Sequence, residues 1–232
     1  MSKRGVLTLI IVLGAIGLIT FGGFFLDLLN IRKIVIEGGE RITTDDVLRM
    51  IDIQIGDSLL TADLRGAATR LHQHQWIRVA NVSIRFPDVH IKLEGRMPFA
   101  VVRLPDQGPM WCDEEGYVLT PFIENEQEAD VLMIEGLGEA VSTPDGPRVG
   151  DEAAWSAVRL VLRSELGAFS TLEKITFHAG GMDLLNEAQQ RLRLPMERTS
   201  RALRRFQAVW PFLDEGAIKN LDVRFPGEFV YQ

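Results

Sequence analysis

The chain opens with a long run of uncharged, mostly apolar positions, and only afterwards do charged positions alternate with apolar ones. Residues 5–26 form 22 consecutive positions without a charged side chain. With a rise of about 1.5 Å per residue, a helix of this length can cross the roughly 30 Å hydrocarbon core of a bilayer. The pattern therefore predicts a transmembrane helix over residues 5–29, followed by a water-soluble body.

The charges beside this run predict its orientation. Lys3 and Arg4 precede it and Asp27 follows it. Because positive residues stay on the cytoplasmic side, residues 1–4 are expected to form a short cytoplasmic tail, with the body on the opposite side. A cleaved signal peptide is the alternative. Its apolar region normally spans about 7–15 residues before a small-residue cleavage site, whereas residues 21–28 contain no A-x-A pattern.

The first part of the body, residues 30–97, is expected to fold in the order β-α-α-β-β. Ile34 and Ile36 alternate with charged neighbours, as in a strand with one apolar face. An N-cap cluster at residues 43–46 predicts a short helix, and either Thr61 or Asp63 begins a second one. Two further runs of alternating apolar and polar residues, 81–86 and 89–94, are expected to form a hairpin. The covered face of this module is expected to include Leu64, Leu71, Ile84 and Ile91, with Arg85 on the opposite face.

Residues 98–232 predict a second, mixed β domain with two helices, so that the fold class is α+β. The helices are expected near residues 154–167 and 199–212, and residues 142–150, with two prolines and two glycines, are expected to form a loop. The sheet is expected to be a meander. Its strands are predicted at residues 99–102, 111–112, 117–119, 131–134, 172–178, 182–186, 191–194, 218–225 and 229–231.

Composition narrows the classes of partner. The formal net charge is −7, and since residues 1–29 carry +1, the body carries −8. Such an acidic body is poorly suited to nucleic acid, whose phosphates attract positive surfaces. Cys112 is the only cysteine, which excludes an internal disulfide and a cysteine zinc cage.

No catalytic constellation is evident. The four histidines do not share a helix face in metal-ligand spacing, and no nucleophile or phosphate-loop motif is present. Asp113, Glu114 and Glu115 suggest either a cation site or an acidic hairpin tip, and they lack the spacing of a calcium loop. We therefore expect no enzyme activity, metal, cofactor or small-molecule substrate.

Binding through the backbone is the remaining chemistry. A sheet whose last strand ends the chain exposes unpaired N–H and C=O groups, which can accept a strand from another protein. Pro226 and Glu228 could instead blunt this edge. Arg198, Arg201, Arg204 and Arg205 cluster on one predicted helix, either as a solvated face or as a contact patch for an acidic partner.

Motifs along the body resemble the FtsQ/DivIB family of bacterial division proteins, which carry a POTRA module after a membrane anchor. The resemblance rests on residues 35–38, 55–60, 85–88 and 96–100, and on Leu221-Asp222-Val223-Arg224-Phe225 near the end of the chain. It covers nearly all of residues 30–232 and is weakest over residues 124–152.

The resemblance implies a non-enzymatic scaffold of the inner membrane, with a periplasmic body located at the division septum. Family members bind the coiled-coil membrane proteins FtsB and FtsL through the β domain and so help to control septal peptidoglycan synthesis. A POTRA-type chaperone for outer-membrane assembly or secretion is the alternative. The partner-binding residues that the resemblance implies are Arg224, Phe225, Gly227, Glu228, Phe229, Val230 and Tyr231. Arg204 and Arg205, from the predicted arginine cluster, are expected to form a secondary contact.

Overall fold

The computed structural model describes residue 14 and residues 28–123, 131–213, 219–225 and 230–231. Residues 1–4 and most of the predicted membrane segment, residues 5–29, lie outside this part of the chain. Within the described residues, no helix combines the length and the apolar character needed to cross a membrane. The chain divides into two compact units, unit 1 over residues 1–95 and unit 2 over residues 96–232.

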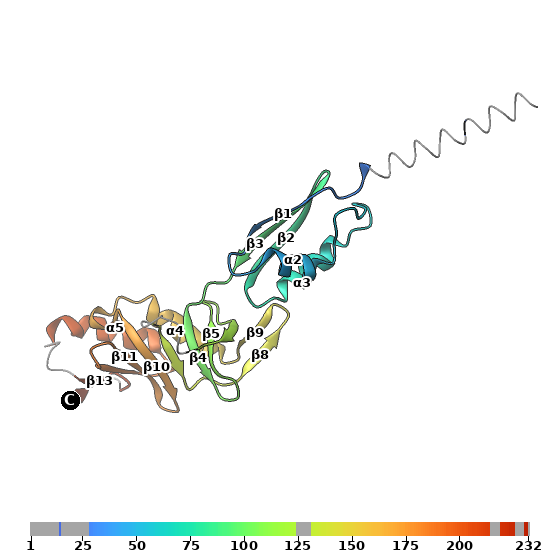
Figure 1. The fold of residues 1–232 in the computed structure, drawn as a ribbon. Helices are drawn as coiled ribbons and strands as arrows, with labels where there is room; N and C mark the ends of the chain where they lie inside the picture. The colour runs from blue at the N-terminus through green and yellow to red at the C-terminus, as the bar shows by residue number, and fades with distance from the viewer. Residues whose placement is uncertain (1–13, 15–27, 124–130, 214–218, 226–229, 232) are drawn as a thin grey trace, which may run out of the picture. The chain divides into compact units, whose positions relative to one another are not determined.

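Unit 1 is a small sheet with two helices on one side (Figure 1). Its order confirms the predicted β-α-α-β-β pattern: β1 (Ile34–Gly38), α2 (Thr44–Ile51), α3 (Leu64–His72), β2 (Ile77–Arg85) and β3 (Asp88–Gly95). The sheet order is β1-β3-β2. β1 runs parallel to β3, and β2 pairs with β3 in the antiparallel sense.

Local side-chain chemistry explains where these elements begin and end. The Thr43 hydroxyl accepts the Asp46 N–H at 3.2 Å at the start of α2, and the Asp63 carboxylate accepts the Gly66 N–H at 2.8 Å at the start of α3. Of the two predicted starts for the second helix, Asp63 is the observed cap. β1 ends at Gly38, where φ is +81° and a β-carbon would collide with the Leu93 carbonyl oxygen.

The unit 1 core matches three of the four residues assigned to the covered face. Leu71 is 0% exposed and Ile91 is 1% exposed, and Leu64 packs against the same core. Ile84 differs, because 41% of it is exposed. It lies opposite the buried Val89, but Ile84 belongs to the edge strand β2 whereas Val89 belongs to the central strand β3.

Leu71 provides a stability test of unit 1. We expect Leu71→Ala to lower the free energy of unfolding by about 2–5 kcal/mol, because it leaves a cavity under the helices. Arg85→Ala, at an exposed position, should cost less than about 1 kcal/mol. Urea unfolding of the purified chain measures both. Equal losses at the two positions would contradict the observed burial.

Unit 2 contains a sheet of nine strands in the order β14-β13-β12-β11-β10-β7-β4-β5-β6. Among the described residues, a separate two-stranded hairpin, two α-helices and two short 3-10 helices, Gly167–Phe169 and Trp210–Phe212, complete it. The strands of the large sheet are β4 (Ala100–Leu104), β5 (Gly108–Cys112), β6 (Val118–Pro121), β7 (Met133–Glu135), β10 (Leu172–His178), β11 (Gly181–Asn186), β12 (Arg191–Leu194), β13 (Asn220–Asp222) and β14 (Val230–Tyr231).

Two expectations for this unit were wrong. Residues 142–150 do not form a simple loop, because β8 (Ala140–Thr143) and β9 (Gly146–Val149) pair as a hairpin. Nor is the sheet a meander: β7 inserts in parallel between β4 and β10, and β12 runs parallel to β13. The mixed character of the domain is nevertheless as predicted.

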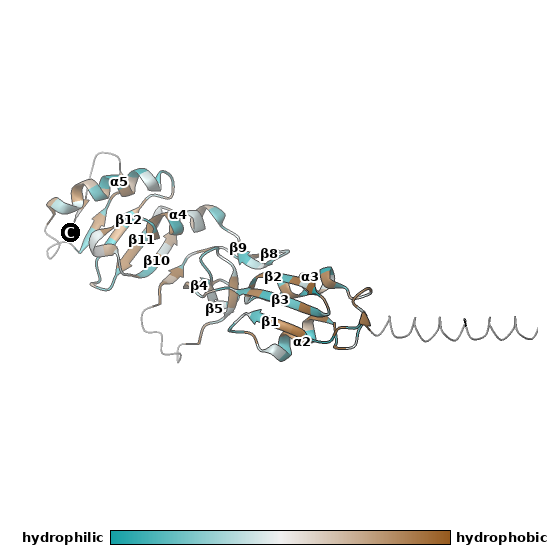
Figure 2. Ribbon diagram, turned by 90° about the horizontal axis from the view of Figure 1, so that it is seen from above, coloured by the Kyte–Doolittle hydropathy of each residue, from teal (hydrophilic) through white to brown (hydrophobic). Residues whose placement is uncertain are grey.

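The two helices supply the apolar cover of the large sheet. Asp151 caps α4 (Glu152–Leu162) by accepting the Ala154 N–H at 2.9 Å. α5 (Thr199–Val209) alternates hydrophobic and hydrophilic residues along its length (Figure 2). Trp155 of α4 and Phe206 of α5 are each 1% exposed and share one core with β10 to β13. This core fixes the strands that lead to the edge of the sheet.

Candidate partner-binding edge

The last strand, β14, lies at one edge of the large sheet. Among the described strands it pairs with β13 alone, in antiparallel register, with Leu221 opposite Tyr231 and Asp222 opposite Val230. At the other edge, the residues just before β6 contact the β8–β9 hairpin, since the Val149 N–H donates to the Gly116 carbonyl at 2.9 Å. The β14 edge is thus the one at which a further strand could be added.

The neighbouring strands reveal which backbone groups of β14 face outward. The Arg191 N–H donates to the Lys219 carbonyl at 2.8 Å, and the Val223 N–H donates to the Arg193 carbonyl at 3.0 Å. Backbone groups alternate sides along a strand, so Asp222 faces β14 and forms a hydrogen-bonded pair with Val230. The N–H and C=O of Tyr231 therefore point away from β13, toward the open edge.

Arg224 and Phe225 lie two and three residues after the end of β13. Arg224 binds the carboxylate of Asp222 with two nitrogens, Nη2 at 2.6 Å and Nε at 3.0 Å. Its guanidinium lies 5.6 Å from the centre of the Phe225 ring. Phe225 is 52% exposed, and its carbonyl accepts Nη1 of Arg205 at 3.1 Å. These contacts connect the edge to α5.

A cationic pocket of about 370 Å³ lies between α5 and the residues after β13. Two predicted site residues, Arg205 and Arg224, line it together. Arg198 and Arg201, two other members of the predicted arginine cluster, line it as well, beside the acidic Glu197. This grouping, which we call the arginine pocket, suits an anionic group on a partner.

The remaining predicted site residues do not line the arginine pocket, and three of them lie outside the described part of the chain. Arg204 is exposed on α5 but does not line the arginine pocket. Val230 is 50% exposed and shares the face of Asp222. Gly227, Glu228 and Phe229 lie outside the described residues.

Opposite charges alternate across the sheet face away from the helices. Glu135 accepts bonds from Lys174 at 2.7 Å and Arg103 at 3.2 Å, and Asp183 lies 3.5 Å from Arg193. The strand registers place the charged residues Glu135, Asp183, Arg193 and Asp222 in one row with Thr176 and Val230, and this row ends at the edge strand. Such cross-strand pairs favour this register of the last strands over a slipped one.

Two carboxylates of this row have lowered pKa values. A hydrogen bond from Lys174, opposed by partial burial, holds the pKa of Glu135 below its usual value, with help from Arg103. Burial alone would raise the pKa of Asp222, but the guanidinium and backbone N–H of Arg224 outweigh it and the net shift is downward. Both groups therefore prefer the charged form in the folded protein.

We expect these shifts to make unit 2 acid-sensitive. A carboxylate with a lowered folded-state pKa contributes stability above its unfolded pKa, and this contribution is lost as the pH falls through the folded value. The free energy of unfolding should thus decline below about pH 4. In urea unfolding across a pH series, the Glu135→Gln, Asp222→Asn double variant should show a shallower decline. If the free energy of unfolding of the double variant declines with pH as steeply as that of the unsubstituted chain, Glu135 and Asp222 are not the source of the acid sensitivity.

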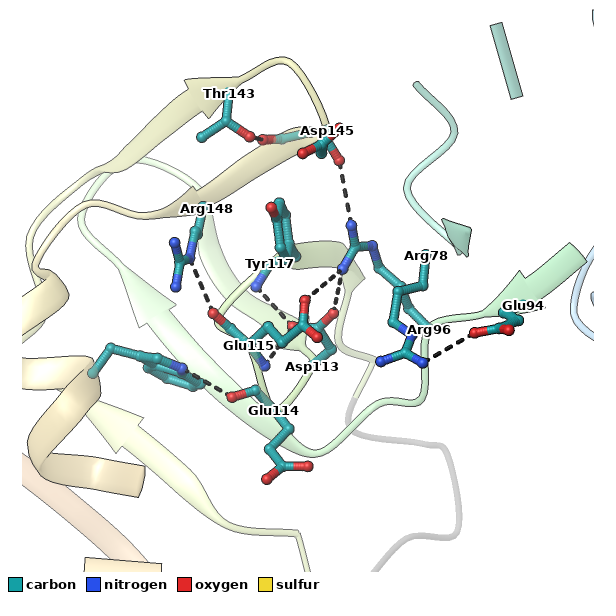
Figure 3. Close-up of polar contacts among 12 residues, drawn as sticks. Arg78, Glu94, Arg96, Asp113, Glu114, Glu115, Tyr117, Thr143, Asp145 and Arg148 are labelled. Carbon is teal, nitrogen blue, oxygen red and sulfur yellow. Dashed lines mark hydrogen bonds and ion pairs between the residues drawn. The ribbon is translucent and has the colours of Figure 1, made fainter. Parts of the chain in front are cut away.

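A second polar cluster lies far from this edge, around the predicted acidic tip (Figure 3). Asp113 does not form a solvated tip: it is 4% exposed and accepts Nη1 of Arg96 at 2.7 Å. Its other oxygen accepts the N–H groups of Glu115 at 3.0 Å and Tyr117 at 2.9 Å. The expectation of an acidic tip holds only for Glu114 and Glu115, which are exposed. The neighbouring Cys112 is buried, and burial raises the pKa of its thiol far above the usual value.

Comparison with known proteins identifies relatives of both parts of this chain. The model for the POTRA domain, FtsQ-type, matches residues 29–95. A Cell division protein FtsQ of Anaeromyxobacter sp. (strain K) is 33% identical over 153 residues, which cover 62% of this chain and 51% of that protein. One of Syntrophotalea carbinolica is 29% identical, covering 60% and 47%. Residues 29–95 thus match a POTRA domain of the FtsQ type, and the chain is similar to Cell division protein FtsQ over about 60% of its length.

The comparisons also define how far the likeness to FtsQ extends. A Cell division protein FtsQ of Geobacter sp. (strain M21) is 26% identical over 64% of this chain and 53% of its own length. The chain thus matches about half the length of these FtsQ relatives. Within unit 1, the family model covers the whole β-α-α-β-β fold.

Proposed function

We propose that this chain is a non-enzymatic scaffold of bacterial cell division. In this proposal the β domain binds FtsB- and FtsL-like coiled-coil membrane proteins and so helps to control septal peptidoglycan synthesis. Relatives named Cell division protein FtsQ support the division role. The observation that carries the binding role is the open edge of β14, where the outward N–H and C=O of Tyr231 can pair with an incoming strand.

The arginine pocket supports the choice of partner. Arg205 and Arg224 lie beside the open edge, so a strand added there would place its flanking residues near their guanidinium groups. Acidic residues next to the incoming strand would pair with these groups, and opposite potentials of this kind mainly raise association rate and specificity. We infer that the partner carries a β-strand-forming segment with acidic neighbours.

The proposal includes anchoring in the inner membrane. Residues 5–29 would form the single transmembrane helix, with residues 1–4 in the cytoplasm and the body in the periplasm. This anchor would hold the β domain near membrane proteins that share the same bilayer. The support is the uncharged run of residues 5–26 after Lys3 and Arg4.

A reporter fusion tests this topology. Alkaline phosphatase, which is active only in the periplasm, should be active when fused after Gln232 in the intact chain. A reporter that is active only in the cytoplasm should be silent at the same point. The reverse result would overturn the proposed orientation.

Co-purification from cells tests the function itself. The tagged full-length chain, extracted in mild detergent, should retain coiled-coil division proteins, and a fluorescent fusion should concentrate at the septum before constriction. The Arg201→Ala, Arg205→Ala double variant should bind more weakly, by a factor that shrinks as salt rises, because exposed charges are screened. Retention of outer-membrane assembly proteins, with uniform fluorescence around the cell, would favour the POTRA-type chaperone instead.

A further inference from the structure

Among the described residues of unit 1, the most exposed large apolar side chains belong to two surface turns. Ile55 is 68% exposed and Leu60 is 73% exposed, both in the segment between α2 and α3. Phe86 is 62% exposed in the turn between β2 and β3. The other exposed large apolar residues described in this unit, Leu48, Val79 and Ile84, range only from 37% to 41%.

Backbone hydrogen bonds join both turns to the residues at the start of unit 1. The Leu59 N–H donates to the Leu29 carbonyl at 2.8 Å, and the Ile31 N–H donates to the Asp57 carbonyl at 2.8 Å. The Arg32 N–H donates to the Pro87 carbonyl at 3.4 Å. Figure 1 shows the same arrangement, with both turns at the end of unit 1 where residues 28–33 enter it.

This end of unit 1 is where the proposed membrane anchor stops. Residues 5–29 form the predicted span, and Leu29 is itself a hydrogen-bond partner of the α2–α3 segment. A turn that is bonded to the last residue of a membrane span cannot lie far from the lipid surface. Ile55, Leu60 and Phe86 therefore share one short region of unit 1 beside the predicted exit of the chain from the bilayer.

We propose that Ile55, Leu60 and Phe86 insert into the interfacial layer of the bilayer and so set the orientation of unit 1 on the membrane. The inference rests on the anchor in the proposed function. Moving apolar side chains from water to the boundary between headgroups and acyl chains lowers the free energy. Exposed apolar patches of this kind mark membrane contacts. Arg32, Lys33 and Arg85, all exposed at this end, are suited to anionic lipid headgroups.

Acidic residues of the same end do not oppose the contact strongly. The Asp57 carboxylate accepts the Gln54 N–H at 2.7 Å, so it faces its own turn. Asp88 is half-buried at the first position of β3. Arg32, Lys33 and Arg85 are exposed and outnumber the exposed Asp57, and we expect the three cationic side chains to contact the headgroups of phosphatidylglycerol.

The test uses the full chain in vesicles of phosphatidylethanolamine and phosphatidylglycerol. Single cysteines replace Ile55, Leu60 or Phe86, and each is labelled with a nitrobenzoxadiazole probe. Cys112 is buried with a raised thiol pKa, so the unsubstituted chain serves as the labelling blank. Val79→Cys is the matched control: it is also exposed on β2, about 23 Å from Phe86 at roughly 3.3 Å per residue.

Nitroxide-labelled lipid should quench the probes at positions 55, 60 and 86, while the probe at position 79 keeps its fluorescence. Flotation of the chain with the vesicles after alkaline washing reports on the anchor separately. If the chain floats but the probes at the three positions are not quenched, the lipid contact is overturned and these residues would instead contact a protein partner. Equal quenching at all four positions would also overturn it, and failure to float would overturn the anchor and the inference together.

Discussion

Asp113→Ala is expected to destabilise unit 2 by about 3–5 kcal/mol, because a buried guanidinium loses its closest counter-charge and keeps, among the described residues, only the half-exposed Glu115 at 3.8 Å. The Arg96 side chain is 3% exposed and that of Asp113 is 6% exposed. The carboxylate also accepts two N–H groups that hold the β5–β6 turn. The Arg96 guanidinium also lies 3.7 Å from the centre of the Tyr117 ring, so the loss of its partner should also disturb the packing around Tyr117 (Figure 3).

Urea unfolding in mild detergent, followed by the fluorescence of the nearby Trp111 and Trp155, measures this loss. Glu114→Ala is the matched control in the same turn. Its carboxylate lies 3.4 Å from Arg163, but both side chains are largely exposed, so the cost should be below about 1 kcal/mol. Similar losses for the two variants would show that burial does not set the strength of the Arg96–Asp113 pair.

Unit 1 could be predicted from its sequence because each element carries its own signal. Its strands alternate apolar and polar residues, and Thr43 and Asp63 sit at the N-caps that their residue types favour. The exposure of Ile84 could not be predicted in this way. Alternation assigns a residue to a face of the sheet, but it does not say how far the helices extend over that face.

Unit 2 was harder to predict because its arrangement depends on distant pairings. The parallel insertion of β7 between β4 and β10 joins segments that no local pattern connects. Pro147 and Gly146 indicate a loop, yet the β8–β9 hairpin accommodates both residues in β9. The sequence predicts a solvated Asp113, because its partner Arg96 is 17 residues away and no local pattern connects the two.

The candidate site was predictable in outline but not in its contacts. The chain-end strand and the arginine cluster follow from residue types and spacing. The pairing of Arg224 with Asp222 was missed, although residues two apart on a strand share a face. That Arg198, Arg201 and Arg205 line one pocket with Arg224 depends on α5 lying beside the residues that follow β13, which only the tertiary structure reveals.

Register also decides which substitution blocks the edge without damaging the sheet. Val230 pairs with Asp222 within the sheet, so Val230→Pro would remove a bond between β14 and β13 and detach the strand. Tyr231→Pro would remove an N–H that faces outward, and proline is tolerated at such edge positions. Tyr231→Pro is therefore the sharper test of strand addition.

We expect Tyr231→Pro to weaken capture of the coiled-coil partners by about tenfold or more, since one ladder bond is lost and the ring obstructs the incoming strand. Tyr231→Phe keeps the backbone N–H and should bind nearly as well as the unsubstituted chain. Pulldown by the full-length chain measures capture, and circular dichroism verifies the fold. Full binding by Tyr231→Pro, together with loss of binding by the Arg201→Ala, Arg205→Ala variant, would move the interface from the edge of β14 to the face of α5.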